Sequence, residues 1–298
     1  MKFQSLYLPL WFLKVKFFGK RQPLQSVVFI SDLCNLKCRH CCVYARKTPT
    51  VKSFEQIKDD LEYCYRLGSR FVDFEGGEPT LWRDGKRDIN SLVRLAKETG
   101  FFSTTITTNA VRPFDGLEAD SLWISLDGIG EYHDKIRGAG AFDKLVKNIA
   151  YSGHKHLNVN MVINTVNYSS VDDTLEFVKQ NPNIEAISFN FHTPYPDTED
   201  LFLDWEIRRQ IIDKLIEYKQ KKYPIINSVS GLRLMKHNKF KKQCWVSNFI
   251  LVDGSRLPMC DGDSKGLCDS CGFCMAGEMH SVMALKPDTL FAGMKLRM

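Results

Sequence analysis

The sequence predicts an α/β fold, in which a partial (β/α)6 barrel of parallel strands is followed by a small cysteine-rich C-terminal module. Short β-branched and aromatic runs alternate with longer helical patterns, and this alternation indicates parallel strands joined by right-handed helical crossovers. After residue 224 the chain becomes loop-rich and holds five of the ten cysteines. We therefore expect an amphipathic basic segment over residues 1–22, the barrel over 23–224 and the module over 225–298.

The individual elements follow from the spacing of the apolar residues. Ser53 followed by Gln56, and Asp172 before Leu175, are typical of helix starts. Strands are expected near residues 26–31, 70–74, 102–107, 121–126, 157–163 and 185–191. Helices are expected near residues 54–67, 88–99, 142–152, 171–180 and 203–221.

Composition and charge narrow the classes of protein. Hydrophobic residues make up 44% and charged residues 26% of the chain, as in an ordinary globular protein. The net charge of +6 is not gathered into an arginine-rich stripe interleaved with aromatic residues, so we expect no nucleic-acid partner. Six of the ten cysteines are separated from a neighbouring cysteine by two or three residues, a spacing that suits metal coordination and is poor for disulfides. We therefore expect the protein in a reducing cytoplasm.

The N-terminal segment over residues 1–21 allows two interpretations. Its apolar run from residue 6 to 13 is too short to span a bilayer, which needs ~20 apolar residues, and it contains Pro9. It also lacks the cleavage site of a signal peptide. A helix lying in the inner membrane interface would suit its leucine and aromatic residues, followed by Lys14, Lys16, Lys20 and Arg21. The alternative is a helix packed on the protein's own core.

Polar or glycine-rich clusters follow four of the predicted strands. They read SDLCNLKCRHC, EGGEP, TTN and SLDG. Parallel strands place their carboxyl ends at one rim, where ligands bind in α/β barrels and open parallel sheets. The sequence therefore predicts one ligand site built from these four clusters.

The first cysteine group is Cys34, Cys38 and Cys41, with the spacing C-x3-C-x2-C. Three thiolates in a compact loop can hold three irons of a 4Fe–4S cluster and leave the fourth iron without a protein ligand. A zinc site, which would need a fourth ligand, and structural thiols without a metal are the alternatives. We interpret Cys42 as a packed apolar thiol or as a reserve ligand.

The string CNLKCRHC resembles the signature loop of the radical S-adenosylmethionine (SAM) superfamily, and EGGEP resembles that superfamily's SAM-binding motif. TTN, WISLDG and HDKIRG resemble the motifs that follow in members related to molybdenum-cofactor and peptide-maturation enzymes, so the resemblance covers about residues 24 to 195. It implies that Cys34, Cys38 and Cys41 bind three irons and that SAM chelates the fourth. It also implies a one-electron reductant, flavodoxin-like or ferredoxin-like, and reductive cleavage of SAM to a 5′-deoxyadenosyl radical.

The same resemblance implies a set of SAM contacts. The two glycines of GGEP would let the backbone pass close to the methionine amino group, and Arg137 would pair with the SAM carboxylate. Arg137 could instead be a surface cation, Asp127 part of a turn and Asn164 a loop cap. The implied contacts are His40, Gly76, Gly77, Glu78, Pro79, Asn109, Ser125, Asp127, Arg137 and Asn164.

The second cysteine group lies in the C-terminal module. The stretch VDGSRLPMC resembles the hairpin of SPASM or twitch extensions, which hold auxiliary clusters, although the gap from Gly254 to Cys260 is one residue longer than usual. Five cysteines fit one further 4Fe–4S cluster with one thiol left over, and the spacing does not identify the spare. Zinc on four of these thiols is the alternative. The group is Cys244, Cys260, Cys268, Cys271 and Cys274.

These observations predict a radical SAM enzyme that acts by hydrogen abstraction or radical addition. Its substrate stays open between a lipid or isoprenoid, a peptide and a small metabolite. A looser resemblance to radical SAM enzymes of isoprenoid lipids rests on the basic N-terminal segment and the cysteine-rich C-terminus. The alternative function is a non-catalytic iron–sulfur or zinc scaffold, against which the intact GGEP argues.

Overall fold

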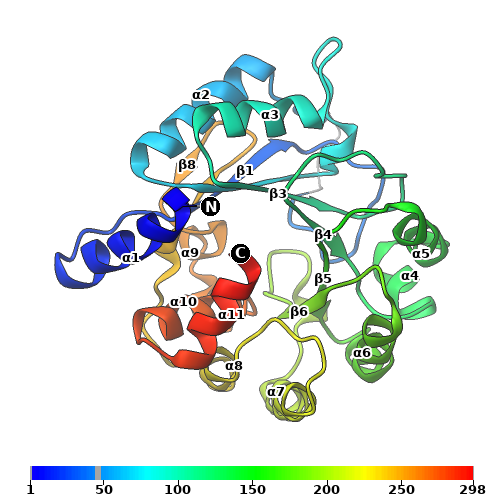
Figure 1. The fold of residues 1–298 in the computed structure, drawn as a ribbon. Helices are drawn as coiled ribbons and strands as arrows, with labels where there is room; N and C mark the ends of the chain where they lie inside the picture. The colour runs from blue at the N-terminus through cyan, green and yellow to red at the C-terminus, as the bar shows by residue number, and fades with distance from the viewer. Residues whose placement is uncertain (1, 44–47, 298) are drawn as a thin grey trace.

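A curved parallel sheet forms the centre of the computed structural model, which describes residues 2–43 and 48–297. The strand order is β6-β5-β4-β3-β2-β1-β7-β8, and the first seven strands in this order are parallel. The six predicted strands are confirmed as β1 (Gln25–Ser31), β2 (Phe71–Gly76), β3 (Ser103–Thr108), β4 (Ser121–Ser125), β5 (Leu157–Ile163) and β6 (Ala186–Phe191). Figure 1 shows this sheet as the wall of an incomplete barrel with helices outside it.

The predicted helices are also confirmed, with ends within two residues of those expected. They are α2 (Phe54–Leu67), α3 (Ile89–Thr99), α5 (Ala141–Tyr151), α6 (Val171–Gln180) and α7 (Trp205–Gln220). Ser53 caps α2 through a capping box with Gln56. Asp172 is not the start of α6, because a 3-10 turn runs directly into that helix and Ser170 is its N-cap. The sequence did not predict α4 (Glu131–Arg137), whose seven residues make just under two turns, too few to show a clear apolar repeat.

The alternation of buried residues along the strands separates two faces. In β2, Val72 and Phe74 belong to the same apolar core as Ile57 of α2 and Leu92 of α3. The residues between them therefore face the inside of the barrel. The apolar core thus lies between the sheet and its outer helices.

The C-terminal region extends the barrel sheet. Its strand β7 (Ser247–Ile250) pairs in parallel with β1, and β8 (Arg256–Leu257) pairs antiparallel with β7. Its helices are α8 (Val229–Met235), α9 (Asp261–Ser264), α10 (Met275–Met283) and α11 (Pro287–Arg297). In Figure 1, α8, α10 and α11 lie in the gap that the six-stranded barrel would leave between β6 and α1.

A close backbone contact joins this region to β6. A Cβ atom at Gly272 would lie 1.9 Å from the carbonyl oxygen of Phe191, so only glycine fits there. The Phe191 amide donates to the Gly272 carbonyl at 2.8 Å. The cysteine-rich loops are therefore held against the carboxyl end of a barrel strand.

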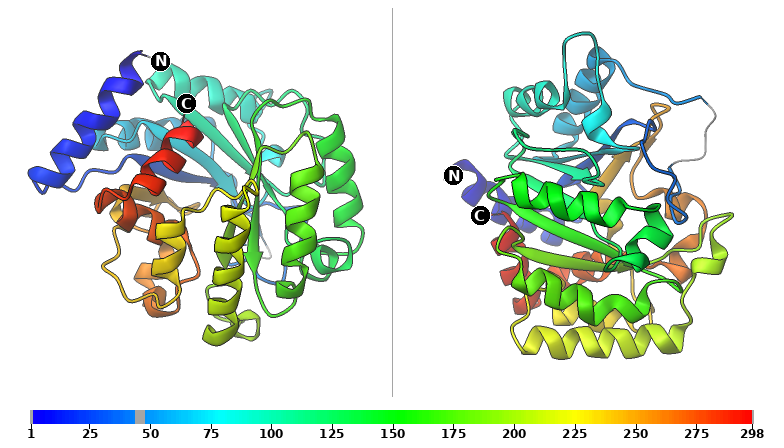
Figure 2. Two further views of the ribbon diagram at one scale, coloured as in Figure 1. Left: turned by 60° about the horizontal axis from the view of Figure 1, so that its bottom comes forward. Right: turned by 90° about the vertical axis from the view of Figure 1, so that its right-hand side faces the viewer.

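The N-terminal helix α1 (Lys2–Phe17) has two apolar sides. Trp11 and Val15 are buried against Trp245 and Met283 of the C-terminal region. The opposite side exposes Leu6, Leu10, Leu13 and Phe17. In both views of Figure 2 the start of α1 and the end of α11 lie close together. Among the described helices, none is both long and apolar enough to cross a bilayer.

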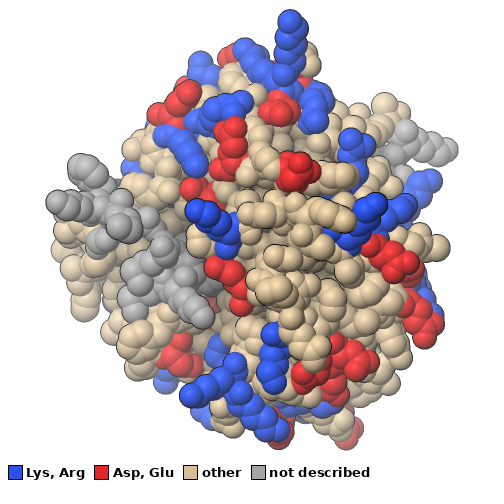
Figure 3. All heavy atoms as spheres, turned by 45° about the vertical axis from the view of Figure 1, so that its right-hand side comes forward, with Lys and Arg blue, Asp and Glu red and all other residues tan. Residues whose placement is uncertain are grey.

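Charged side chains of both signs are mixed on the surface shown in Figure 3. On this face Lys and Arg side chains lie among Asp and Glu side chains, with uncharged surface between many of them. The net charge of +6 is therefore not concentrated into one basic stripe on this face.

Candidate functional site

The cysteine loop that follows β1 is held by backbone contacts at both ends. Gly77 N–H donates to the Ser31 carbonyl at 2.7 Å, and Glu78 N–H donates to the Leu33 carbonyl at 2.8 Å. Further along, Arg39 N–H donates to the Ile136 carbonyl of α4 at 2.9 Å. The loop is thus fixed between the ends of two barrel units.

The two glycines of GGEP allow the first of these contacts. A Cβ at Gly76 would lie 2.1 Å from the Ser31 carbonyl oxygen, and one at Gly77 would lie 2.2 Å from that of Leu33. Gly76 also has a φ of +151°, which side chains rarely adopt. The glycines are therefore needed to seat the cysteine loop, and their contact with SAM stays a prediction.

The three thiols of this loop are half-buried and interact electrostatically. Burial raises the pKa of Cys34 and raises that of Cys38 to about 11, while the Arg137 guanidinium acts in the opposite direction at both thiols. The positive charge thus favours the thiolate form, which is the form that binds metal. Cys42 is exposed as a residue, but desolvation raises the pKa of its thiol to about 12, and Lys265 and Asp261 of the C-terminal region are among its charged neighbours. Its interpretation as a packed thiol or a reserve ligand therefore stays a prediction.

Glu78 joins the ends of β2 and β3 and is 1% exposed. Its Oε1 accepts hydrogen bonds from the hydroxyls of Thr80 and Thr108, each at 2.7 Å. Its Oε2 accepts from the Asn109 amide at 2.8 Å. Because the carboxylate holds Asn109, it also positions the Asn109 side chain, whose Nδ2 lies 3.9 Å from Cys34 Sγ. Glu78 therefore stabilises the rim by hydrogen bonds that link the end of β2 to the end of β3.

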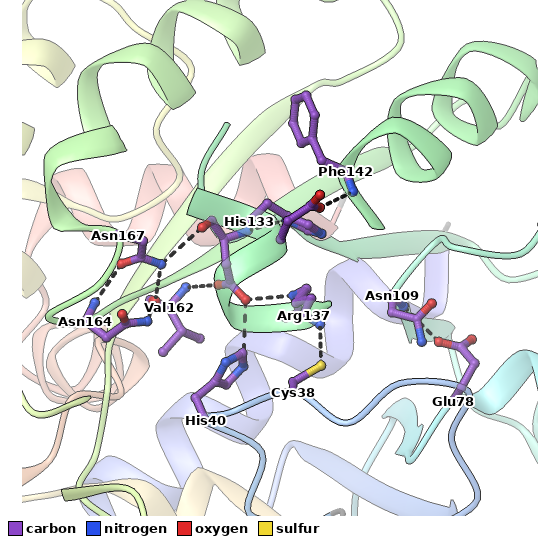
Figure 4. Close-up of polar contacts among 12 residues, drawn as sticks. Cys38, His40, Glu78, Asn109, His133, Arg137, Phe142, Val162, Asn164 and Asn167 are labelled. Atoms are coloured by element: carbon purple, nitrogen blue, oxygen red, sulfur yellow. Dashed lines mark hydrogen bonds and ion pairs between the residues drawn. The ribbon is translucent and has the colours of Figure 1, made fainter. Parts of the chain in front are cut away.

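A buried ion pair reaches the cysteine loop from the other side (Figure 4). Arg137 Nε donates to Asp127 Oδ2 at 2.7 Å, and Arg137 Nη1 lies 3.8 Å from Cys38 Sγ. Asp127 Oδ1 accepts from the Val162 amide at 2.9 Å. Burial alone would raise the pKa of Asp127, but Arg137 and other neighbours lower it, so the carboxylate stays charged. Arg137 is 8% exposed, so it is not a surface cation.

His40 lies beside this pair and has an unsatisfied nitrogen. Its Nε2 is 3.7 Å from Asp127 Oδ2, and its buried Nδ1 has no hydrogen-bond partner among the described residues. Burial lowers the pKa of His40 to about 4, so the ring is neutral at pH 7. An unpaired buried nitrogen at the rim fits a site that receives a further polar group.

The remaining predicted contacts differ in their position. Ser125 ends β4 and is half-buried, and Pro79 begins the 3-10 turn after the glycines. Asn164 is fully buried, and its side chain accepts from the Val166 amide at 2.9 Å and donates to the Val162 carbonyl at 3.1 Å. This is the loop-capping role of the alternative interpretation. Asn167, which the sequence analysis missed, donates to the Asp127 carbonyl at 3.2 Å.

The C-terminal thiols divide into two environments. Cys244, Cys260, Cys268 and Cys271 are half-buried, whereas Cys274 is fully buried in the main apolar core. Burial, together with the thiols of the other three half-buried cysteines, raises the pKa of Cys244 to about 12. The pKa of Cys274 is also raised to about 12, mainly by burial, and the Arg208 guanidinium acts in the opposite direction.

The donor atoms can be compared with what each metal requires. Among the described residues, no three His, Cys, Asp or Glu side chains converge on a point where a single metal ion could bind. A structural zinc site gathers four ligands on one ion, whereas a 4Fe–4S cluster takes its cysteines on separate irons. Two groups of half-buried thiols near cations fit the ligands of iron–sulfur clusters.

The family of the protein follows from its similarity to known proteins. The model of the radical SAM superfamily matches residues 28–178, just over half of the chain. The chain therefore belongs to the radical SAM superfamily. Its cysteine-rich extension resembles those of SPASM and twitch members.

Two curated relatives show how much of the chain is shared. Fe-coproporphyrin III synthase of Methanosarcina barkeri is 29% identical over 221 residues, which is 68% of this chain and 53% of the relative. Mycofactocin maturase MftC of Mycobacterium tuberculosis is 32% identical over 166 residues, which is 52% of this chain and 41% of the relative. The chain thus spans about half the length of these relatives.

A solved structure shows the same fold. SuiB of Streptococcus suis, in its crystal structure bound to SAM, superposes with a TM-score of 0.65 at 20% sequence identity. The superposition covers 84% of this chain and 63% of SuiB. At this identity the likeness supports the partial barrel and its extension, and the residue roles rest on the geometry above.

Proposed function

We propose that this chain cleaves SAM reductively in the cytoplasm, with a 4Fe–4S cluster on Cys34, Cys38 and Cys41 and SAM on the fourth iron. When bound, the cluster supplies one electron from a flavodoxin-like or ferredoxin-like donor to the sulfonium, which breaks a C–S bond to give methionine and the 5′-deoxyadenosyl radical. The superfamily implies this chemistry and both cofactors, while the ligands and contacts in this chain are our proposal.

The position of Arg137 supports this proposal most directly. Its guanidinium is buried beside Cys38 and oriented by Asp127, whose other oxygen is held by the backbone of β5. A cation fixed next to the thiols can stabilise thiolates and can pair with a carboxylate such as that of SAM. We propose that His40, Asn109 and Ser125 contact SAM from the same rim.

We propose a polar substrate, such as a peptide or a hydrophilic metabolite. The residues of β2 that face the barrel interior are Asp73 and Glu75, and Glu75 accepts from the Thr107 hydroxyl at 3.2 Å. Across the barrel, Asn190 Nδ2 donates to Asn160 Oδ1 at 2.8 Å. An isoprenoid chain bound in the barrel would displace water from these polar side chains. Each donor or acceptor that lost its hydrogen bond in this way would cost about 1–3 kcal/mol.

An auxiliary 4Fe–4S cluster is the second part of the proposal. We propose Cys244, Cys260, Cys268 and Cys271 as its ligands, because their half-buried thiols interact with one another. Cys274 is then the spare thiol, since it is enclosed by the apolar core and its amide donates to Asn190 Oδ1 at 2.8 Å.

Anaerobic purification with iron and sulfide analysis tests both clusters. About eight irons per chain would support two clusters and about four only one. Zinc without iron would favour the alternative of a zinc scaffold. Release of 5′-deoxyadenosine after addition of dithionite and SAM then separates an enzyme from a non-catalytic iron–sulfur scaffold.

The substrate class has its own test. Release of 5′-deoxyadenosine should rise when an aqueous extract of peptides and metabolites is added, and it should not respond to a lipid extract. Stimulation by the lipid extract alone would contradict a polar substrate.

We also propose that α1 contacts the membrane peripherally. Its exposed row of Leu6, Leu10, Leu13 and Phe17 is followed by the exposed cations Lys20 and Arg21, a combination that suits an anionic bilayer surface. Flotation with anionic liposomes should be lost in the variant Leu6→Glu/Leu10→Glu/Leu13→Glu. Equal flotation of this variant and the parent would remove the membrane role.

A further inference from the structure

Arg208 is a buried cation whose charge is not balanced within the described part of the chain. It lies on α7 and is 0% exposed. Its Nη2 donates to the Cys271 carbonyl at 2.9 Å. Its Nε and Nη1 are buried and have no hydrogen-bond partner among the described residues. Because an uncompensated buried charge costs several kcal/mol, this arrangement requires an explanation.

Aromatic rings surround the Arg208 guanidinium and offset only part of the cost of burying its charge. Its central carbon lies 4.1 Å from the ring centre of Trp205, 4.8 Å from that of Phe191 and 5.5 Å from that of Phe202. Cation–π contacts of this kind contribute about 0.5–2 kcal/mol. Burial lowers the pKa of Arg208, and the groups that oppose this are the thiols of Cys274 and Cys271.

A second cation, Lys242, shares the Cys271 thiol with Arg208 as an electrostatic neighbour. Lys242 is half-buried, and the groups that favour its charge include the thiols of Cys271, Cys244 and Cys268. Its Nζ donates to the Asn238 carbonyl at 3.1 Å, and among the described residues neither Lys242 nor Arg208 forms an ion pair with a carboxylate. The structure therefore places two cations beside one group of thiols.

We propose that Arg208 is the buried counter-charge of the auxiliary cluster, a positioning residue that stabilises its anionic form and favours its one-electron reduction. This inference rests on the auxiliary cluster of the proposed function. A cluster bound by four thiolates is anionic and becomes more so when it gains an electron from a reductant such as dithionite. A fixed cation beside it therefore raises the reduction potential, and the cluster would supply the negative charge that Arg208 lacks.

The test uses the full chain with Cys34, Cys38 and Cys41 replaced by alanine, so that only the auxiliary cluster is present. The midpoint potential of this cluster is followed by EPR during a redox titration. Arg208→Met should disfavour reduction by tenfold or more, which is a shift of about 59 mV to lower potential for one electron. Arg208→Lys keeps the positive charge, so its midpoint potential should lie close to the parental value. Arg209→Met, on the same helix and half-exposed, is the matched control.

The stability of the iron-free protein gives a second readout, in which Arg208→Met should not be harmful. Without the cluster, Arg208→Met removes an uncompensated buried charge, so the urea midpoint should rise or stay equal. A merely structural arginine would instead give a lower midpoint in this form. With iron and sulfide added, the same variant should lose its cluster to a chelator faster than the parent.

The outcomes separate the inference from the proposed function. If the parental triple variant binds no iron–sulfur cluster, the auxiliary cluster itself is refuted. If it binds one and Arg208→Met has the parental potential, the counter-charge role is refuted and the cluster stands. Should Arg208→Met fail to fold without iron, the arginine is structural and the inference is overturned.

Discussion

The two cysteine groups, one in the loop after β1 and one in the C-terminal region, balance their charges differently. At the barrel rim, the cation near the thiols is Arg137, and Asp127 already pairs with it. In the C-terminal region, Arg208 and Lys242 lie near the thiols without a carboxylate ion pair among the described residues. The rim is thus organised by an ion pair and hydrogen bonds of the protein itself, whereas we expect the second group to depend on the cluster proposed for it.

This difference has a physical meaning. A pre-paired cation keeps its place when the site is empty, because its charge is already satisfied. A buried cation that lacks a partner destabilises the protein when no cluster is bound. An anionic cluster beside the cation would remove this cost. We therefore expect the rim to keep its shape without iron and the C-terminal loops to gain stability when iron binds.

The largest expected effect is at the rim. Cys38→Ala should lower SAM cleavage by more than ~100-fold, because a cluster ligand matters more than outer partners, whose loss typically costs 10–100-fold. The rate is measured as 5′-deoxyadenosine release under dithionite. Cys42→Ala is the control, since Cys42 is exposed, and it should release product at the parental rate. Parental cleavage by Cys38→Ala would refute the ligand set.

Arg137 is expected to come next. Arg137→Met should lower kcat/KM for SAM about 10–100-fold, since the cation beside Cys38 and its pairing with a carboxylate are lost. Lys135→Met, on the exposed side of the same helix, is the matched control. If both variants have equal kcat/KM, the buried pair has no role in SAM binding.

The spare thiol distinguishes the second group. Cys244→Ala should reduce iron from about eight to about four per chain, whereas Cys274→Ala should keep both clusters. Because Cys274 is fully buried, its removal should lower the thermal midpoint without loss of iron. Loss of four irons in Cys274→Ala would make it a ligand and would require another spare.

The smallest effect concerns pH and the barrel interior. Burial and Asp73 raise the pKa of Glu75 to about 7 from 4.5. Since the folded state holds this proton more tightly than the unfolded state, stability falls as pH rises from about 4.5 to 7. Glu75→Gln should therefore stabilise the iron-free protein by about 1–3 kcal/mol above pH 7 and little near pH 4.

Urea unfolding at both pH values measures this effect. The exposed Glu98→Gln on α3 serves as the control and should change stability little at either pH. A Glu75→Gln variant with the same stability difference at pH 4 and pH 8 would show that the carboxyl is not proton-linked to folding.

The sequence predicted the barrel well because each unit carries its own signal. All six strands and five outer helices have full periods, and Ser53 with Gln56 is a local capping signal. The strand β7 was missed because it has four residues and its partner β1 is more than 200 residues away. Pairing between strands so far apart in the chain produces no pattern that a local segment of the sequence could show.

The sequence predicted which residues form the site better than it predicted what each of these residues does. The motifs located the rim, and the structure brings Cys38, His40 and Arg137 together around Asp127. Arg208 was missed because an arginine on an amphipathic helix looks like a surface charge. Only the packing of α7 against the C-terminal loops reveals its burial.

The parallel pairing of β7 with β1 also decides how this protein can be divided. A chain that ends near residue 224 would leave β1, the strand that leads into the cysteine loop, with a bare hydrogen-bonding edge. Such an open edge invites association with other copies. A shortened protein intended for crystallisation should therefore retain residues 225–257, or it will be lost as aggregates before any question about its chemistry can be asked.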